Sequence, residues 1–135
     1  FGLSHDLETR IGIPYPETQE AFKEYLLKMI TLWKNGEVAA NLETYENFYD
    51  RILSVVHDFS ESTENALLVS SSGVIAALVA RLLDVPLKDQ PKLLLSVSHT
   101  CLNRFEPICG DLTPTLFCAT PHLDHHYRSH ARTFL

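Results

Sequence analysis

Residues 66–83 constrain the fold more than any other part of the sequence. Residues 66–69 are four apolar residues without alternation, which is typical of a strand buried on both faces of a parallel sheet. Three serines and Gly73 follow. Residues 74–83 are then apolar almost all the way round, which predicts a helix packed on the sheet and ended by Pro86. This order predicts an α/β layer architecture.

Two amphipathic helices are predicted before this segment. Apolar side chains recur at three- and four-residue spacing over residues 16–34 and again over residues 45–59. Asn41 or Thr44 is available as the N-cap of the second helix, and residues 60–65 form the loop after it. The aromatic residues of both helices are explained by a helix core and do not require a ligand pocket.

The remaining segments predict shorter elements. A short helix is expected over residues 89–97, and two strands, 100–109 and 112–119, are expected to join across Gly110-Asp111. The first residues carry no helix or strand signal, and the last residues, rich in His and Arg, are predicted to form an exposed tail. We expect residues 1–135 to form one domain.

Composition excludes several classes of function. The 135 residues include 17 acidic and 11 basic ones, and the basic residues form no run, so we expect no nucleic-acid binding. No apolar stretch reaches the roughly 18–20 residues of a membrane span, and the first residues do not resemble a signal peptide, so a cytoplasmic location is expected. Cys101, Cys109 and Cys118 are predicted to be reduced, buried thiols.

The serine turn carries the clearest chemistry. A strand that runs into a serine-rich turn and a helix brings free backbone N–H groups, hydroxyls and the positive helix end to one point, which favours a phosphate. Ser70, Ser71, Ser72 and Gly73 are therefore the candidate phosphate-binding residues. Serine is also the ordinary N-cap residue and many strand-to-helix turns bind nothing, so the turn alone is a weak signal for a ligand.

Four segments together resemble the histidine phosphatase superfamily, whose members are phosphoglycerate-mutase-like. Residues 68–78 resemble its second signature, in which a strand leads into Ser-His-Gly-Gly-Val-Ile. Residues 43–51 resemble its Glu-Ser-x-x-x-Phe-x-x-Arg helix. Residues 99–105 resemble its Asn-x-Ser-Val-Thr strand, and residues 119–123 its closing His-Leu. The resemblance implies a three-layer α/β/α domain with a mostly parallel central sheet.

The resemblance covers about residues 20–123, the C-terminal two-thirds of such a domain. In active members, an N-terminal strand ends in Arg-His-Gly, and that His attacks the phosphoryl group. This sequence contains no Arg-His-Gly, so we expect the chain to lack the N-terminal strand and its motif. Ser71 occupies the position of the second catalytic His and, being uncharged, offers a weaker hydrogen bond than an imidazolium.

Two further catalytic candidates come from the resemblance. His99 replaces the Asn of the later strand signature, where it either returns an imidazole to the pocket or is an ordinary histidine before a strand. Glu8 is the nearest candidate by order for the family's general acid, and the alternative is a solvated loop residue. The implied partner is a phosphorylated small molecule or phosphate, with no membrane partner and no cofactor, and a homodimer stays open.

The sequence thus favours phosphomonoester hydrolysis or phosphate binding at a degenerate site, with a non-catalytic pseudophosphatase that binds a phospho-ligand or a protein as the alternative. A serine hydrolase is a lesser reading: residues 69–73 approximate Gly-x-Ser-x-Gly, with Ser71 as nucleophile and His99 or His122 as base, but Val69 replaces the first glycine. The tail could also bind a metal, although its spacing is not that of a standard closed site; its candidates are His122, Asp124, His125, His126 and His130.

Overall fold

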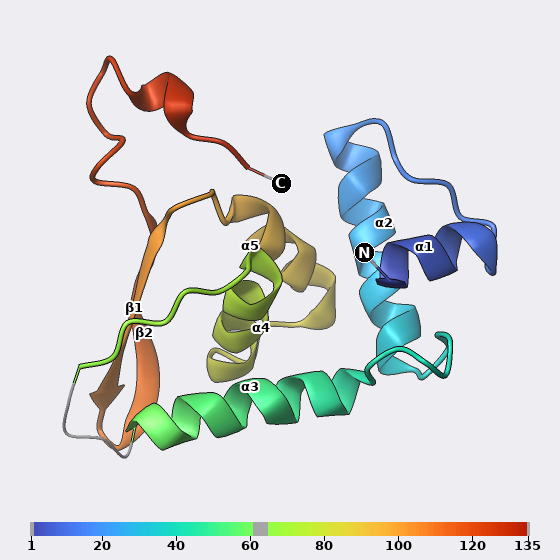
Figure 1. The fold of residues 1–135 in the computed structure, drawn as a ribbon, viewed down its shortest axis with the longest axis horizontal. Helices are drawn as coiled ribbons and strands as arrows, with labels where there is room; N and C mark the ends of the chain where they lie inside the picture. Colours follow the sequence, from blue (N-terminus) through green and yellow to red (C-terminus); the bar gives the residue numbers. More distant parts are fainter. Residues whose placement is uncertain (1, 61–64, 135) are drawn as a thin grey trace. The chain divides into compact units, whose positions relative to one another are not determined.

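The computed structural model of the protein describes residues 2–60 and 65–134 (Figure 1). Helices and strands are mixed along the chain. The chain forms two compact units, Phe1–Ile52 and Leu53–Leu135, which we call the N-terminal and the C-terminal unit. The α-helices are α1 (Gly2–Thr9), α2 (Gln19–Lys34), α3 (Tyr45–Ser60), α4 (Ser72–Leu82) and α5 (Gln90–Ser96). The strands are β1 (Leu102–Ile108) and β2 (Asp111–Ala119), and the 3-10 turns are η1 (Leu87–Asp89) and η2 (Ser129–Ala131).

Both amphipathic helices are confirmed. The Thr18 hydroxyl accepts a hydrogen bond from the Ala21 N–H at 3.2 Å and so begins α2. Thr44, one of the two predicted caps, accepts from the Asn47 N–H at 3.2 Å and begins α3. The loop predicted over residues 60–65 lies largely outside the described residues, because residues 61–64 are not described.

The N-terminal unit contains a helix that the sequence did not indicate, α1. Its Leu7 side chain is 1% exposed, and the core of this unit also includes Tyr25, Leu26 and Ile52. Asp6 is buried as well, and its carboxylate accepts two hydrogen bonds from Arg10, at 2.8 and 2.9 Å, one helical turn later. Tertiary burial therefore stabilises a segment whose own sequence signal is weak.

Asp6 also joins α1 to the segment after α2. Its carboxylate accepts from the Ala39 N–H at 3.1 Å, while Arg10 donates to the Glu37 carbonyl at 2.8 Å. The hydrogen bond from Arg10 lowers the pKa of Asp6, against the smaller raising effect of burial. One charged pair thus holds two chain segments together.

We expect Asp6→Asn to lower the Tm by several degrees near neutral pH. Because the folded pKa of Asp6 is lowered, its contribution to stability is fully present above the unfolded pKa of about 3.9 and is lost as the pH falls through the folded value. Thermal unfolding of both proteins between about pH 2 and 7 checks this. The difference in Tm should shrink toward acid, whereas the exposed neighbour change Glu8→Gln should alter Tm little. A decrease in Tm for Asp6→Asn that had the same size at all pH values would contradict a lowered folded pKa of Asp6.

An aromatic cluster closes the same unit around Trp33. The Trp33 ring lies 5.4 Å from that of Tyr45 and 5.0 Å from that of Phe48, and its indole N–H donates to the Glu43 carbonyl at 2.7 Å. These contacts join the end of α2 to the start of α3. These three rings therefore pack against one another, whereas Phe59, near the end of α3, is 44% exposed and is not a core residue.

The C-terminal unit is built around α4, whose residues 76–80 are all buried. This helix contacts α5 and β2, so it is the apolar centre of its unit, as its near-continuous apolar sequence predicted. It ends at Leu82, where Asp84 takes a positive φ of 48° and the Val85 N–H returns to the Ala80 carbonyl at 2.9 Å. The short helix predicted over residues 89–97 is confirmed as α5, with Pro91 buried in its first turn.

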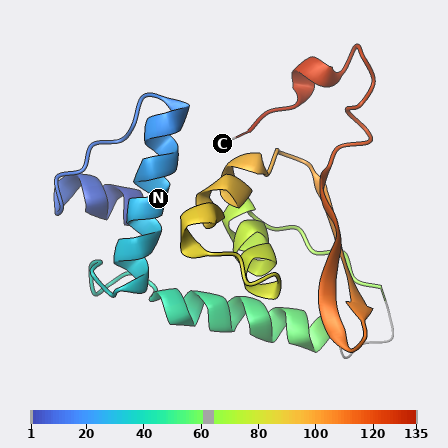
Figure 2. The same ribbon diagram turned by 180° about the vertical axis from the view of Figure 1, so that it is seen from behind.

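The two predicted strands form an antiparallel hairpin, seen from both sides in Figures 1 and 2. Cys109 and Gly110, with φ of 54° and 92°, make the turn between Ile108 and Asp111. Leu102 pairs with Ala119, and the register shifts twice before Phe105 pairs with Pro114. Such irregularities are β-bulges, which bend a strand and redirect its side chains.

The strand predicted at residues 66–69 is not seen in the structure, where these residues have no regular secondary structure. The only sheet among the described residues is the two-stranded antiparallel hairpin, so the mostly parallel central sheet and its three layers are not seen there. Leu67 and Val69 are 87% and 96% exposed. A parallel strand needs a neighbouring strand to hydrogen-bond with, and no described segment supplies one.

None of the helices within residues 2–60 and 65–134 has both the length and the apolar composition of a membrane-spanning helix.

Candidate functional site

The serine turn lies at the start of α4, as predicted. Ser71 is the N-cap, with extended backbone angles, and its hydroxyl accepts from the Val74 N–H at 3.4 Å. Its carbonyl accepts from the Ile75 N–H at 3.1 Å. Ser70 and Ser71 are exposed, while Ser72 and Gly73 are half-buried. The turn is therefore a capped helix N-terminus that solvent reaches.

Two backbone donors remain at this turn. In the part of the chain that the structure describes, the N–H groups of Ser72 and Gly73 have no acceptor, as is usual in the first turn of a helix. A Cβ added at Gly73 would meet only the Ser71 hydroxyl oxygen, at 3.9 Å, so packing does not require glycine there. An anion at this point would meet two N–H donors, nearby hydroxyls and the positive end of the helix.

The other two catalytic candidates lie apart from the turn or in the other unit. His99 is exposed and attached to the C-terminal segment, since its N–H donates to the Thr133 carbonyl at 2.8 Å and its Nδ1 lies 2.9 Å from the Thr133 hydroxyl. Among the contacts of residues 2–60 and 65–134, none joins His99 to Ser71. Glu8 is exposed on α1 in the N-terminal unit, and its approach to the serine turn stays a prediction.

Two of the candidate metal ligands in the tail are engaged with protein groups. His122 Nε2 lies 3.0 Å from the Thr100 hydroxyl, and Asp124 accepts from the Thr120 hydroxyl at 3.1 Å and forms an ion pair with Arg132. Within the described ranges, no three His, Cys, Asp or Glu side chains gather closely enough to hold a metal ion. The described tail therefore offers no assembled metal centre.

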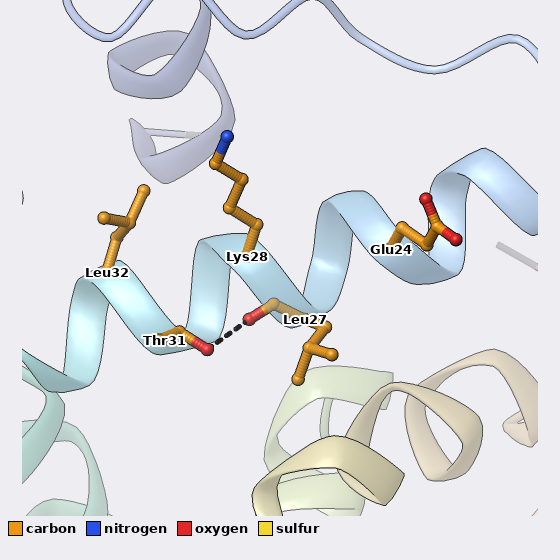
Figure 3. Close-up of a pocket in the computed structure, with 5 residues that line it drawn as sticks. All are labelled: Glu24, Leu27, Lys28, Thr31 and Leu32. Carbon is orange, nitrogen blue, oxygen red and sulfur yellow. Dashed lines mark hydrogen bonds between the residues drawn. The ribbon is translucent and has the colours of Figure 1, made fainter.

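A shallow hollow lies along α2 (Figure 3), lined by Glu24, Leu27, Lys28, Thr31 and Leu32. All five residues belong to one helix, and the Thr31 hydroxyl donates to the Leu27 carbonyl at 2.7 Å. A surface made by one helix cannot surround a small molecule as ligand sites usually do. None of the candidate catalytic residues lines it, so we assign it no role.

An ion pair joins the first and last residues of the segment at 43–51. The Arg51 guanidinium donates two hydrogen bonds to the Glu43 carboxylate, both at 2.9 Å. These hydrogen bonds lower the pKa of Glu43 and raise that of Arg51. The first and last residues of this segment therefore fix the chain that enters α3.

Comparison with known proteins decides the family. A sequence model described as "Histidine phosphatase superfamily (branch 1)" matches residues 6–117, well over half of the chain. The chain belongs to this superfamily. Searches among curated proteins and among solved structures found no match.

As a histidine phosphatase family member, the chain carries the serine turn inside the matched region, and His99 also lies within it. The match extends to residue 6, so Glu8 is included, whereas the resemblance at 119–123 falls outside it. Membership supports a phosphatase-like or phosphate-binding role. The serine turn can supply neutral hydrogen-bond donors to such a ligand, but its serines carry no positive charge.

Sequence reasoning missed one cluster in this family member, formed by Cys101, Cys118, Ser98 and Asn103. All three cysteines are free thiols, as predicted, but none is fully buried: Cys101 and Cys118 are half-buried, and Cys109 is exposed in the hairpin turn. Cys101 and Cys118 are 17 positions apart and are brought together by the hairpin register. No spacing pattern in a single sequence indicates that register.

Proposed function

We propose that the protein binds a phosphorylated small molecule or inorganic phosphate at the serine turn, with Ser70, Ser71, Ser72 and Gly73 as the binding residues. Family membership is the observation that carries this proposal. The exposed N-terminus of α4, with two N–H groups that lack acceptors among the described residues, supports it. The ligand's oxygens would accept from these amides and from the serine hydroxyls.

The nucleophile of active family members is the histidine of an Arg-His-Gly motif, which does not occur in the 135 residues. We propose that phosphomonoester hydrolysis, if the natural protein performs it, uses an Arg-His-Gly histidine from another part of the polypeptide. In this proposal the chain corresponds to the C-terminal two-thirds of the family domain, with Ser71 in place of the second His. His99 and Glu8 are then the candidates for a returned imidazole and a general acid.

The same proposal includes the complete family fold. In it, residues 66–69 form a strand of a mostly parallel sheet between two helical layers. The exposure of Leu67 and Val69 supports this, because apolar residues with unpaired backbone groups are usually covered by a neighbouring strand. In this proposal, the neighbouring strand is the one that ends in Arg-His-Gly in active family members.

A non-catalytic role is the second candidate, favoured by Ser71. An uncharged serine stabilises a developing phosphoryl charge less than an imidazolium does, but it can still hold a phosphate in the ground state. A pseudophosphatase of this kind would recognise a phospho-ligand, or a protein that carries one, without turning it over.

Phosphate binding is tested by titrating inorganic phosphate into the isotope-labelled chain and following backbone amide signals by NMR. We expect saturable shifts centred on Ser72 and Gly73. Ser71→Ala should weaken binding roughly 2–10-fold, the effect of losing one hydrogen-bonding group. Ser129→Ala, an exposed serine on η2, is the matched control and should change nothing. Because Ser71 also caps α4, each variant's Tm is measured alongside. Shifts spread over the whole surface, or none at Ser72 and Gly73, would refute the site.

Turnover distinguishes the two candidates. The longest natural form of the protein is assayed with an aryl phosphate. Hydrolysis that disappears when an Arg-His-Gly histidine is replaced would support the phosphatase. Saturable phosphate binding without hydrolysis would support the pseudophosphatase.

A further inference from the structure

The region where β1 begins and β2 ends holds two thiols among hydrogen-bonding groups. The Asn103 side chain contacts both cysteines: its Nδ2 donates to Cys101 Sγ at 3.4 Å, and its Oδ1 accepts from the Cys118 N–H at 2.8 Å. One amide group therefore holds Cys101 and Cys118 on either side of it. Both cysteines are half-buried, so each residue is partly exposed to solvent.

Cys118 is turned toward the segment before β1 by an unusual backbone. Its φ is 53°, in the left-handed region, although it lies within a strand. A non-glycine residue rarely adopts this conformation, because its Cβ comes too close to the following carbonyl oxygen, and such strain concentrates where a side chain has a particular task. The register shift between Leu102 and Arg104 is the bulge that accommodates it.

Ser98 supplies the donors that this sulfur meets. Its N–H donates to Cys118 Sγ at 3.1 Å, and its hydroxyl lies 3.5 Å from the same sulfur. Ser98 is 4% exposed, so the rest of the unit holds these two groups in place. The thiol of Cys118 itself donates to the Ser96 carbonyl at 2.9 Å.

We propose that Cys118 is a thiol modification site that reacts with low-molecular-weight disulfides, and that Cys101 is the thiol that resolves the product into an internal disulfide. The Cys118 thiolate attacks one sulfur of the external disulfide and expels the other as a thiolate. Cys101, after losing its proton to water, attacks Cys118 Sγ and expels the second external thiol. Two protein thiols are oxidised and one external disulfide is reduced to two thiols.

The charges around the two sulfurs agree with this division of roles. Burial raises the pKa of Cys118, but the Ser98 hydroxyl and N–H, the neighbouring Cys101 and the positive Arg132 outweigh it and lower that pKa overall. Burial raises the pKa of Cys101, and the nearby Cys118 raises it further, although Asn103 and Ser98 oppose this. Cys118 is thus the better nucleophile, and Cys101 acts after it. The site does not depend on the proposed phosphate turn.

Oxidised glutathione and the whole chain are sufficient for the test. The reduced protein is incubated with this disulfide, remaining thiols are alkylated, and intact and peptide masses are measured. The wild type should lose two hydrogens by joining Cys101 to Cys118 and should retain no glutathione there. Cys101→Ser should instead retain one glutathione on Cys118, and Cys118→Ser should form no internal bond.

Cys109→Ala is the matched control, since Cys109 is exposed in the turn of the same hairpin, and it should behave as the wild type at the other two cysteines. Ser98→Ala should slow the modification of Cys118 roughly 2–10-fold, with an unchanged circular dichroism spectrum. Glutathione on Cys109 alone, equal rates at all three cysteines, or a stable adduct on Cys118 of the wild type would each overturn the proposal.

Discussion

Replacing Leu7 by alanine is expected to lower the free energy of unfolding by about 2–5 kcal/mol. Leu7 is 1% exposed and is one of the two largest fully buried side chains in the described chain. Alanine removes apolar atoms from this site and leaves a cavity, and both effects act in the same direction. Since α1 has a weak helical sequence of its own, loss of Leu7 should also loosen the contact between α1 and α2.

Urea unfolding followed by circular dichroism measures this loss. The matched control is Glu8→Ala, the exposed next residue of the same helix, which should change stability by no more than about 0.5 kcal/mol. If Leu7→Ala matched that control, Leu7 would not be a core residue and α1 would not pack on α2 as described.

Val79→Asp should destabilise the C-terminal unit by roughly 3–5 kcal/mol at neutral pH. Val79 is 3% exposed on α4, the helix that contacts α5 and β2. A carboxylate there loses its hydration, so its folded pKa is raised above the unfolded value of about 3.9. The penalty is therefore largest at neutral pH and decreases as the pH falls through the raised folded value toward the unfolded one.

Arg81→Asp provides the comparison, because it adds the same side chain at an exposed position of the same helix. It lies in the last turn, where a negative charge costs only about 0.3–1 kcal/mol. Denaturant curves for both variants at about pH 4 and pH 7 test the argument. Equal losses for the two variants, or a Val79→Asp loss that grows toward acid, would show that α4 is not the buried centre of its unit.

Much of the local structure was predictable because it is encoded locally. The three- and four-residue spacing identified α2 and α3, and Thr44 was recognised as a cap from its residue type. Gly110 marked the hairpin turn, since a glycine between two apolar runs favours a tight connection. These signals depend on residues a few positions apart, which a single sequence displays.

The structural features that the sequence did not predict share one physical cause: each depends on residues far away in the sequence. Residues 66–69 have the composition of a buried strand, but composition does not supply the strand that must pair with them. The helix α1 depends on burial of Leu7 and on the Asp6–Arg10 pair rather than on its own propensity. Ser71 was predicted at the turn that begins α4 and is its N-cap, whereas the hydrogen bonds of His99 to Thr133 depend on how the last residues fold back.

The hairpin of β1 and β2 has a consequence for how fast the C-terminal unit acquires structure. Its pairs join residues close in the chain, from Ile108 with Asp111 to Leu102 with Ala119, and α4 contacts the nearby α5. Closing such short loops costs little entropy and takes microseconds rather than seconds. We therefore expect the turn at Gly110 to form early and to set the register before the bulge at Cys118 forms. Refolding rates should then change more when residues of the turn are replaced than when residues at the strand ends are replaced.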